Sequence, residues 1–225
     1  MMFRQFVLAA ALVALPAAAS AQQAPLINGA ALAGDAPAAG SARDAADRLS
    51  MRPNVTEARL TQARADQEAS PWRALAPVMG DQFTETRLPQ TARMFASLRA
   101  ALGPSVNTAK EAANRRRPFL SDPSVARCDP PTESVAQDSS YPSGHAAIGW
   151  AWGLVMAELL PARADALLQR GRDFGDSRVV CGYHFPSDIE ASRLIAAAVV
   201  ARLHGEANFR AELEAARREL ARAYR

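Results

Sequence analysis

The chain has 225 residues, 49% of them hydrophobic, and 26 basic against 23 acidic side chains give a formal net charge of +3. A chain of this length can build one domain with a full-sized core. The small net charge, without Lys/Arg runs interleaved with aromatic residues, argues against a nucleic-acid partner and favours a small anion as the ligand.

The first residues have the pattern of an export signal. Arg4 precedes an apolar run over 6–18 that is too short to span a bilayer, and Ala19-Ser20-Ala21 forms a small-x-small cleavage pattern. We therefore expect residues 1–21 to be a cleaved signal peptide and the mature protein to be periplasmic. No later segment predicts a membrane anchor.

The remaining chain divides into a short leader and one domain. Residues 22–43 are rich in Ala, Gly and Pro, which predicts a flexible leader. Residues 44–225 form the expected domain. Its first half predicts helices over 55–67 after Asn54 as N-cap, over 88–102 ended by Gly103, and over 106–116 between Ser105 as N-cap and Pro118.

The second half begins with an irregular stretch. Residues 120–140 are heavy in Pro, Asp and Ser and too long for a plain connector, so we expect a loop over a site. Further helices are predicted over 146–160, over 162–174, from Ser187 with Glu190 completing a capping box, and over 207–224. No alternating strand pattern of convincing length occurs, so the predicted fold is an all-α helical bundle.

The two cysteines suit an exported protein. Cys128 and Cys181 form an even pair, which in such a protein indicates a disulfide more than a metal site. One precedes the turn at Tyr141 and the other stands three residues before His184. The bridge could therefore brace two functional loops against each other.

The turn Pro142-Ser143-Gly144-His145 places a hydroxyl and an imidazole at the start of an apolar helix. A helix N-terminus offers unpaired N–H groups and a partial positive charge, which suit an anion. By itself the tetrapeptide is more typical of an ordinary helix start than of an active site.

Upstream, Lys110 and Arg117 stand seven residues apart on one predicted helix, two turns or about 10.5 Å along its axis. On a shared face they could converge on one anion. With Arg115 and Arg116 beside them, they could instead form a solvated basic face.

Downstream, Ser177-Arg178 is followed by His184 and Asp188. Asp188 would lie in the first turn of the helix capped by Ser187, where the helix dipole keeps it ionised. It could then accept the Nδ1 proton of His184 and leave Nε2 as a nucleophile. The alternative is a His-Asp pair that only clamps a loop.

Taken together, the three stretches resemble the acid-phosphatase signature of the type-2 phosphatidic acid phosphatase and vanadium haloperoxidase superfamily. The signature is Lys, six residues, Arg-Pro; then Pro-Ser-Gly-His; then Ser-Arg, five residues, His, three residues, Asp, and no position is missing here. The context around these residues is most similar to the secreted bacterial class A non-specific acid phosphatases. Phe185-Pro186 departs from the Trp and polar residue typical of such proteins, which bears on substrate preference.

The resemblance implies a role for each matched residue. Three cations would hold the phosphoryl oxygens with the Ser143 hydroxyl and the Gly144 N–H; they are Lys110, Arg117 and Arg178. His184 would attack phosphorus and form a phosphohistidine, and Asp188 would orient it. His145 would protonate the leaving oxygen and then activate water.

The resemblance also implies an enzyme without metal or other cofactor, because three cationic side chains stabilise the charge. Its substrates would be small phosphomonoesters of broad range, with inorganic phosphate as product, possible transfer to alcohols, and a homodimeric assembly. Because nearby cations disfavour protonation of His145, activity should favour acid pH. The third histidine, His204, lies outside every motif and is interpreted as structural.

Three other interpretations compete. A vanadium haloperoxidase could use the same residues, although 225 residues is short for that branch. A membrane-lipid phosphatase is disfavoured because membrane-spanning segments are missing. A non-catalytic phosphate-binding protein would need the cations but not an oriented nucleophile.

Overall fold

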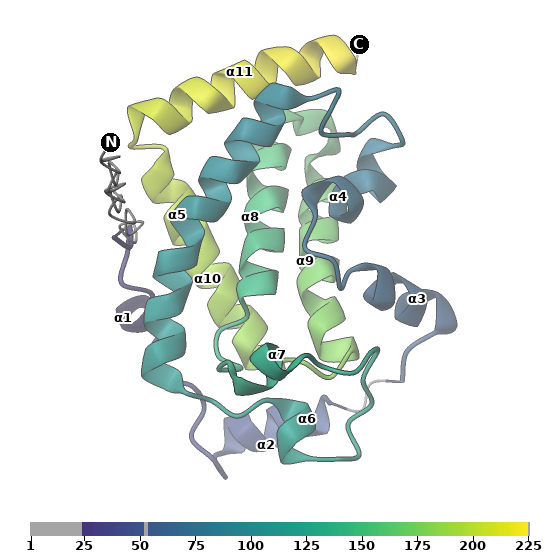
Figure 1. Cartoon of the computed structure of the whole chain (residues 1–225), viewed down its shortest axis with the longest axis vertical. Coiled ribbons are helices and arrows are strands. Elements are labelled where there is room, and N and C mark those ends of the chain that lie inside the picture. Colours follow the sequence, from purple (N-terminus) through teal and green to yellow (C-terminus); the bar gives the residue numbers. More distant parts are fainter. Residues whose placement is uncertain (1–23, 52–53, 225) are drawn as a thin grey trace, which may run out of the picture.

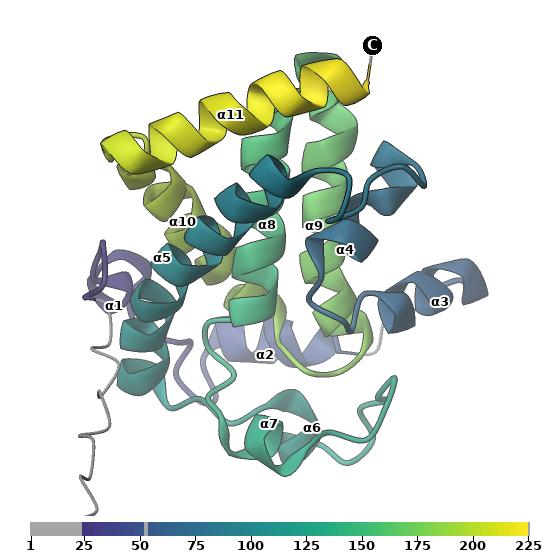
Figure 2. The same ribbon diagram turned by 45° about the horizontal axis from the view of Figure 1, so that its top comes forward.

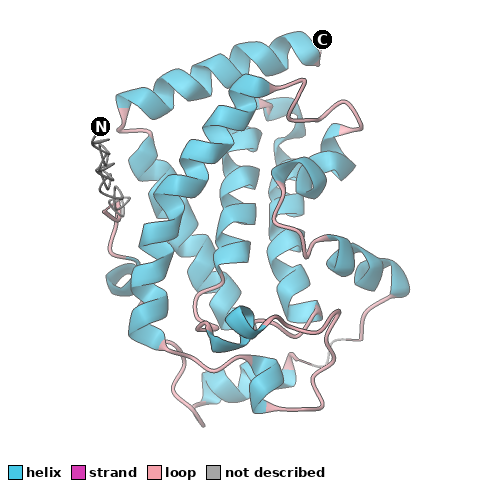
Figure 3. Ribbon diagram, in the orientation of Figure 1, coloured by secondary structure: helices cyan, strands magenta, loops and turns pink. Residues whose placement is uncertain are grey.

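The computed structural model describes residues 24–51 and 54–224 (Figure 1). Over those residues all regular structure is helical and no strand occurs (Figure 3), as predicted. The expected signal peptide, 1–21, lies outside the described residues. The helices are α1 (Gly29–Ala33), α2 (Ala42–Leu49), α3 (Glu57–Ala65), α4 (Pro71–Met79), α5 (Pro89–Ala113), α6 (Pro118–Ser121), α7 (Glu133–Gln137), α8 (Gly144–Leu159), a 3-10 turn (Pro161–Arg163), α9 (Ala164–Val180), α10 (Pro186–Leu203) and α11 (Ala207–Ala223).

Four long helices, α5, α8, α9 and α10, form the body of the molecule, and α11 crosses one end (Figure 1). Helix α8 contacts each of the other three. Most of its residues are buried, Trp152 among them, because its sequence is apolar on all sides, which is typical of a central helix. No helix in the described ranges has both the length and the hydrophobicity to cross a bilayer.

Helices α8 and α9 approach each other through glycines. A Cβ added to Gly149 would lie 2.2 Å from Cδ1 of Phe174, and one added to Gly171 would lie 3.1 Å from the Gly149 carbonyl oxygen. Both distances are shorter than ordinary contact, so the missing side chains allow this packing. The Phe174 ring occupies the space beside Gly149.

Helix α5 is longer than predicted. The sequence indicated two helices separated at Gly103, but one helix of 25 residues runs through Gly103 and Pro104. Leu102 and Val106 are both buried in the core, and this packing outweighs the local cost of the two helix breakers. The helix ends at Ala113, and the C-cap residue Asn114 has a left-handed φ of 42°.

The starts and ends of three other helices also differ from prediction. Helix α9 continues through Gly175 to Val180, so Arg178 is helical. Helix α10 is capped by Asp188, which accepts the Phe185 N–H at 2.8 Å, and not by the expected Ser187–Glu190 box. Helix α3 begins after Thr56, whose hydroxyl accepts the Arg59 N–H, and not after Asn54.

The expected flexible leader is packed where it is described. Gly29 donates its N–H to the Thr108 hydroxyl at 2.9 Å, and a Cβ at Gly29 would lie 2.0 Å from the Ser105 carbonyl oxygen. The Tyr141 hydroxyl donates to the Ala33 carbonyl at 2.9 Å. A small residue at position 29 lets α1 lie directly on α5, which the composition of 22–43 did not reveal.

The irregular stretch after α6 passes beneath one end of the bundle, with α7 inside it (Figure 2). A disulfide joins Cys128 in this stretch to Cys181, just after α9. The expected pairing is therefore present, and it fixes the stretch against the end of α9.

Candidate active site

The signature residues gather where the ends of four helices meet. The C-terminal ends of α5 and α9 and the N-terminal ends of α8 and α10 lie at the lower end of the bundle (Figure 1). Contacts join the three stretches: Arg117 lies 3.0 Å from His184, and the Ser143 N–H donates to the Asp188 carbonyl at 3.4 Å. The fold thus brings together residues up to 78 positions apart, from Lys110 to Asp188.

Two of the predicted cations converge on one carboxylate. Lys110 Nζ lies 2.7 Å and Arg117 Nη2 3.1 Å from Oδ2 of Asp138. Lys110 also donates to the Ser139 carbonyl at 2.5 Å. The sequence suggested that Lys110 and Arg117 share one face of a helix, but they do not. Arg117 lies beyond the end of α5 and is the N-cap of α6. The Asp138 carboxylate shows that both cations can contact one anionic group at the same time.

The third cation, Arg178, is buried in the last turn of α9. Its guanidinium lies over the Tyr183 ring at 4.2 Å, and Nη1 donates to Gln67 Oε1 at 3.1 Å. Burial lowers its pKa to about 10, so it remains a cation at neutral and acid pH. Ser177 beside it donates to Asp66 at 2.6 Å and so has a structural contact.

His184 is held as a neutral imidazole with a defined tautomer. Nδ1 lies 2.7 Å from the Ser140 carbonyl oxygen, which can only accept, so the proton is on Nδ1. Nε2 then carries the lone pair and accepts from Arg117 Nη1 at 3.0 Å. Burial, with the neighbouring arginines, lowers the pKa of His184 to about 3. The arrangement is that of a nitrogen nucleophile facing an anion site.

Asp188 supports His184 less directly than predicted. Its Oδ2 is 3.6 Å from Nδ1, longer than the contact to the Ser140 carbonyl. The same oxygen accepts from the Ser140 hydroxyl at 2.5 Å and from the Phe185 N–H at 2.8 Å. Burial opposes ionisation of Asp188, but His184, Arg115 and Ser140 outweigh it, and its pKa is lowered. The carboxylate therefore fixes the residue whose carbonyl holds the imidazole.

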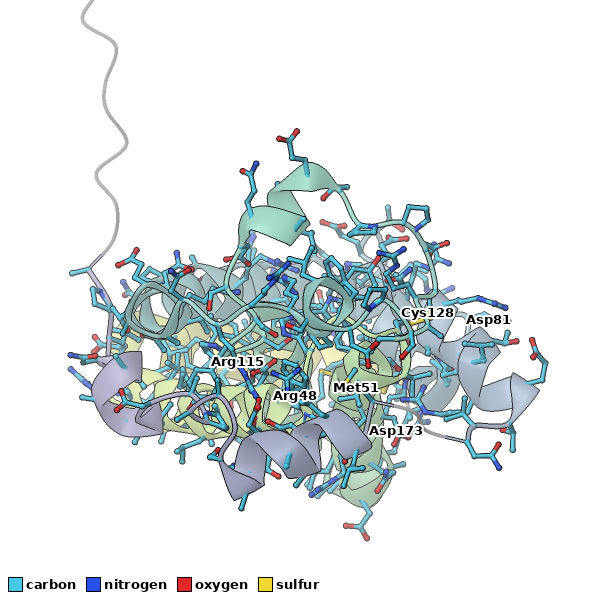
Figure 4. The ribbon with its side chains drawn as sticks, turned by 90° about the horizontal axis from the view of Figure 1, so that it is seen from below. Arg48, Met51, Asp81, Arg115, Cys128 and Asp173 are labelled. Carbon is cyan, nitrogen blue, oxygen red and sulfur yellow. A yellow bond between two sulfur atoms is a disulfide. The ribbon has the colours of Figure 1, made fainter. Side chains whose placement is uncertain are left out.

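Arg115, which the sequence suggested could be part of a basic face, belongs to this network, with 9% of its side chain exposed. It donates to Asp188 Oδ1 at 2.7 Å and to Asp47 Oδ2 at 2.8 Å. Its guanidinium lies 4.1 Å from the centre of the Phe185 ring. Figure 4, which views the molecule from below, labels Arg115 beside α2. The sequence did contain a signal for this role of Arg115. Asp44 and Asp47 are buried acidic residues of the amphipathic helix α2, and buried carboxylates need a cationic partner.

His145 stands in a different environment. It lies in the first turn of α8, stacked on Phe174 with ring centres 4.2 Å apart and planes 11° apart. Its Nε2 is buried and has no hydrogen-bond partner among the described residues. Burial, followed by the charges of Arg178 and His184, lowers its pKa well below 6.5. An unpartnered ring nitrogen is suited to exchanging a proton with a ligand.

The turn before His145 combines a cap with an open approach. Ser143 is the N-cap of α8, and its Oγ accepts the Ala146 N–H at 3.2 Å, which leaves its proton available to a ligand. Gly144 and Lys110 both line a groove of about 190 Å³. The space between α5 and α8 is therefore open beside Lys110 and the first turn of α8.

Two observations concern the remaining predicted features. His204 lies at the opposite end of α10, where Nε2 contacts Glu158 at 2.8 Å, in keeping with a structural role. Among residues 24–51 and 54–224, no group of three or more His, Cys, Asp or Glu side chains is placed to hold a metal ion.

Comparison with known proteins gives two results. Residues 91–208 match the PAP2 superfamily. The chain is 38% identical over 155 residues to an acid phosphatase of Zymomonas mobilis, covering 69% of this chain and 59% of the relative. It is 38% identical to a non-specific acid phosphatase of Providencia stuartii and 37% identical to one of Salmonella typhimurium, each over 66% of this chain and 60% of the relative. The chain thus aligns with about three fifths of the length of these relatives.

Proposed function

Since this chain belongs to the PAP2 superfamily, we propose that it is an acid phosphatase that hydrolyses small phosphomonoesters through a phosphohistidine at His184. The observation that supports the proposal is the tautomer and the orientation of the His184 ring. Its Nε2 lone pair faces Arg117 at 3.0 Å while Nδ1 is bound to the Ser140 carbonyl. A protein that only binds phosphate needs the cations but not this orientation.

In the proposed complex, the phosphoryl group takes the place of the Asp138 carboxylate beside Lys110 and Arg117. Arg178, the Ser143 hydroxyl and the Gly144 N–H bind the remaining oxygens. The helix α8 N-terminus adds a partial positive charge. These groups stabilise the charge that spreads over the phosphoryl oxygens in the transition state, which is the main requirement of phosphoryl transfer.

In the first step, the Nε2 lone pair of His184 attacks phosphorus, and the bond from phosphorus to the ester oxygen breaks. His145 donates its Nε2 proton to the departing oxygen, so the leaving group is released as an alcohol. The Nδ1 proton stays on His184, and the resulting positive charge is stabilised by the Ser140 carbonyl and the nearby Asp188 carboxylate.

In the second step, His145 accepts a proton from water as the water oxygen attacks phosphorus. The bond from phosphorus to Nε2 breaks and its electron pair returns to His184. Inorganic phosphate is released and both histidines regain their starting protonation. An alcohol in place of water would give phosphate transfer, which we propose as a side activity.

Two further features belong to the proposal. Export to the periplasm is supported by the sequence pattern of residues 1–21 and by the Cys128–Cys181 disulfide. A homodimer is supported by the family resemblance alone. N-terminal sequencing of secreted protein tests the first, and light scattering of the purified mature chain tests the second.

The deciding experiment measures hydrolysis of p-nitrophenyl phosphate from about pH 4 to about pH 8, with a chelator present, for wild type and His184→Gln. We expect chelator-resistant activity in acid that disappears in the variant. An alkaline quench during turnover should trap labelled phosphate on wild-type protein, since the P–N bond is labile in acid. A folded wild-type protein that releases no phosphate, or activation of halide oxidation by added vanadate, would overturn the proposal.

A further inference from the structure

A groove of about 190 Å³ leads away from the phosphate site between α5 and α8. It begins at Lys110 and Gly144, the residues assigned to the phosphoryl group, and reaches Arg99 three helical turns earlier along α5. The buried side chains of Val106 and Ile148 form part of its wall. The groove is therefore continuous with the site and largely apolar between two cations.

The groove exists because of the residues at its centre. Its α5 residues recur every three or four positions, so they share one face of that helix. On that face, Gly103 has no atom within 4 Å of the position that a Cβ would occupy. A glycine inside a helix is destabilising relative to alanine. Here the missing side chain adds space to a groove and relieves no packing contact.

The groove lies on the side where a leaving group must depart. The nucleophile and the leaving oxygen stand on opposite sides of phosphorus in an in-line transfer. His184 approaches from the segment that begins α10, and no residue of α9 or α10 lines the groove. Gly144, which does line it, directly precedes His145, the proposed proton donor to the leaving oxygen. Arg99, which also lines the groove, is one of the charges that add to burial in lowering the pKa of His145. A leaving group that points away from His184 would then lie along the groove.

Arg99 provides a second cation at the far end. Its Nη2 donates to the Ala69 carbonyl at 2.8 Å, and its guanidinium lies 5.8 Å from the centre of a Trp152 ring. None of the ion pairs within the described part of the chain includes Arg99. The backbone contact holds the guanidinium in place, and the remaining N–H groups can bind an anion.

We propose that this groove is a leaving-group subsite that selects phosphomonoesters with an apolar body ending in a carboxylate or a similar anion, which Arg99 binds. The inference rests on the proposed phosphatase activity and names the substrate class of that same site. The apolar body would contact Val106 and Ile148, and the terminal anion would contact Arg99.

The test compares two series of alkyl phosphates, one ending in a carboxylate and the other in a hydroxyl, with four to ten carbons. In wild type, kcat/KM should be roughly fivefold higher for the carboxylate than for the alcohol at the best chain length, as expected for a partly exposed charge pair. Arg99→Gln should bring this ratio to about one. Arg93→Gln removes an exposed arginine of α5 outside the groove and should leave the ratio unchanged.

A second variant tests the groove without changing charge. Gly103→Leu should lower kcat/KM for the eight- and ten-carbon substrates by roughly tenfold more than for methyl phosphate, because the new side chain enters open space. Gly103→Ala is the matched control, with a smaller loss and an intact helix.

The outcomes separate the two proposals. If methyl phosphate and p-nitrophenyl phosphate are not hydrolysed, the proposed function fails. If they are hydrolysed but wild type treats carboxylates and alcohols alike, or Gly103→Leu shows no dependence on chain length, the leaving-group subsite is wrong and the phosphatase remains.

Discussion

The two site histidines both have lowered pKa values, yet their surroundings are opposite: His184 is buried, and His145 is partly exposed. Each ring nitrogen of His184 has a partner, the Ser140 carbonyl on one side and Arg117 on the other. His145 is stacked on Phe174, and its Nε2 has no partner in the described structure. A nucleophile benefits from one fixed tautomer, whereas a proton carrier needs a free nitrogen. The surroundings therefore distinguish the two proposed roles better than the residue type does.

The first test of these two proposed roles replaces each imidazole with glutamine. His184→Gln should lower kcat by about 10⁴-fold or more with every substrate, because the covalent step is lost. His145→Gln should lower kcat/KM, which reports the first step and not the shared hydrolysis of the phosphohistidine, by about 10²–10³-fold with an alkyl phosphate, which needs a proton on its leaving oxygen. With p-nitrophenyl phosphate, whose leaving oxygen needs no proton, the loss should be much smaller. Equal losses with both substrates for His145→Gln would contradict its role as the acid.

The second test uses pH. His145 must be protonated, so its lowered pKa places the alkaline limb of kcat/KM below pH 6.5, with about a tenfold fall per pH unit above it. The bound phosphoryl dianion favours that proton, so the limb of kcat should lie at higher pH. His184 must be neutral, and its pKa of about 3 places the acid limb far lower. His145→Gln serves as the control for the ionisation of the substrate itself, and a wild-type limb unchanged in this variant would count against the assignment.

A third, smaller effect should come from Arg115. Arg115→Lys keeps a charge but cannot bridge Asp188 and Asp47 with two N–H groups, so we expect about a tenfold lower kcat. Since Arg115 helps to lower the pKa of Asp188, this pKa should rise in the variant and the acid limb of kcat should move to higher pH. Arg116→Lys, at an exposed neighbour, is the matched control. A loss of thermal stability without movement of the acid limb would assign Arg115 a structural role only.

The smallest effect concerns the phosphate side of the site. Asp138→Asn removes the carboxylate that Lys110 and Arg117 share, so a phosphoryl group no longer has to displace a like charge. KM for phosphomonoesters and the inhibition constant of phosphate should both fall by about threefold. Glu133→Gln, on α7 in the same stretch, should change neither. A higher KM in Asp138→Asn would show that the carboxylate orients the cations and does not compete with the ligand.

The sequence predicted the helical class from helical spacing, the disulfide from an even cysteine pair in an exported chain, and the residues that meet at the site from a three-part signature. It failed where distant packing outweighed a local signal. Gly103 and Gly175 were interpreted as helix ends, but buried neighbours carry both helices through them. Arg115 was not recognised because its partner Asp47 lies 68 positions away in another helix. The indirect path from Asp188 to His184 through Ser140 depends on side-chain positions that no spacing encodes.

The two glycines at which α8 and α9 approach each other, Gly149 and Gly171, form a seam that limits which substitutions this protein can accept. Gly149 leaves room for Phe174, and Phe174 in turn supports the ring of His145. A single methyl group at position 149 would push the aromatic ring toward the proton carrier, so mutational tolerance should be very low along this seam although no side chain there touches a ligand. On α5, by contrast, a Cβ added at Gly103 would meet no atom within 4 Å. New substrate preferences should therefore be reached more readily by substitutions on α5 than by any change between α8 and α9.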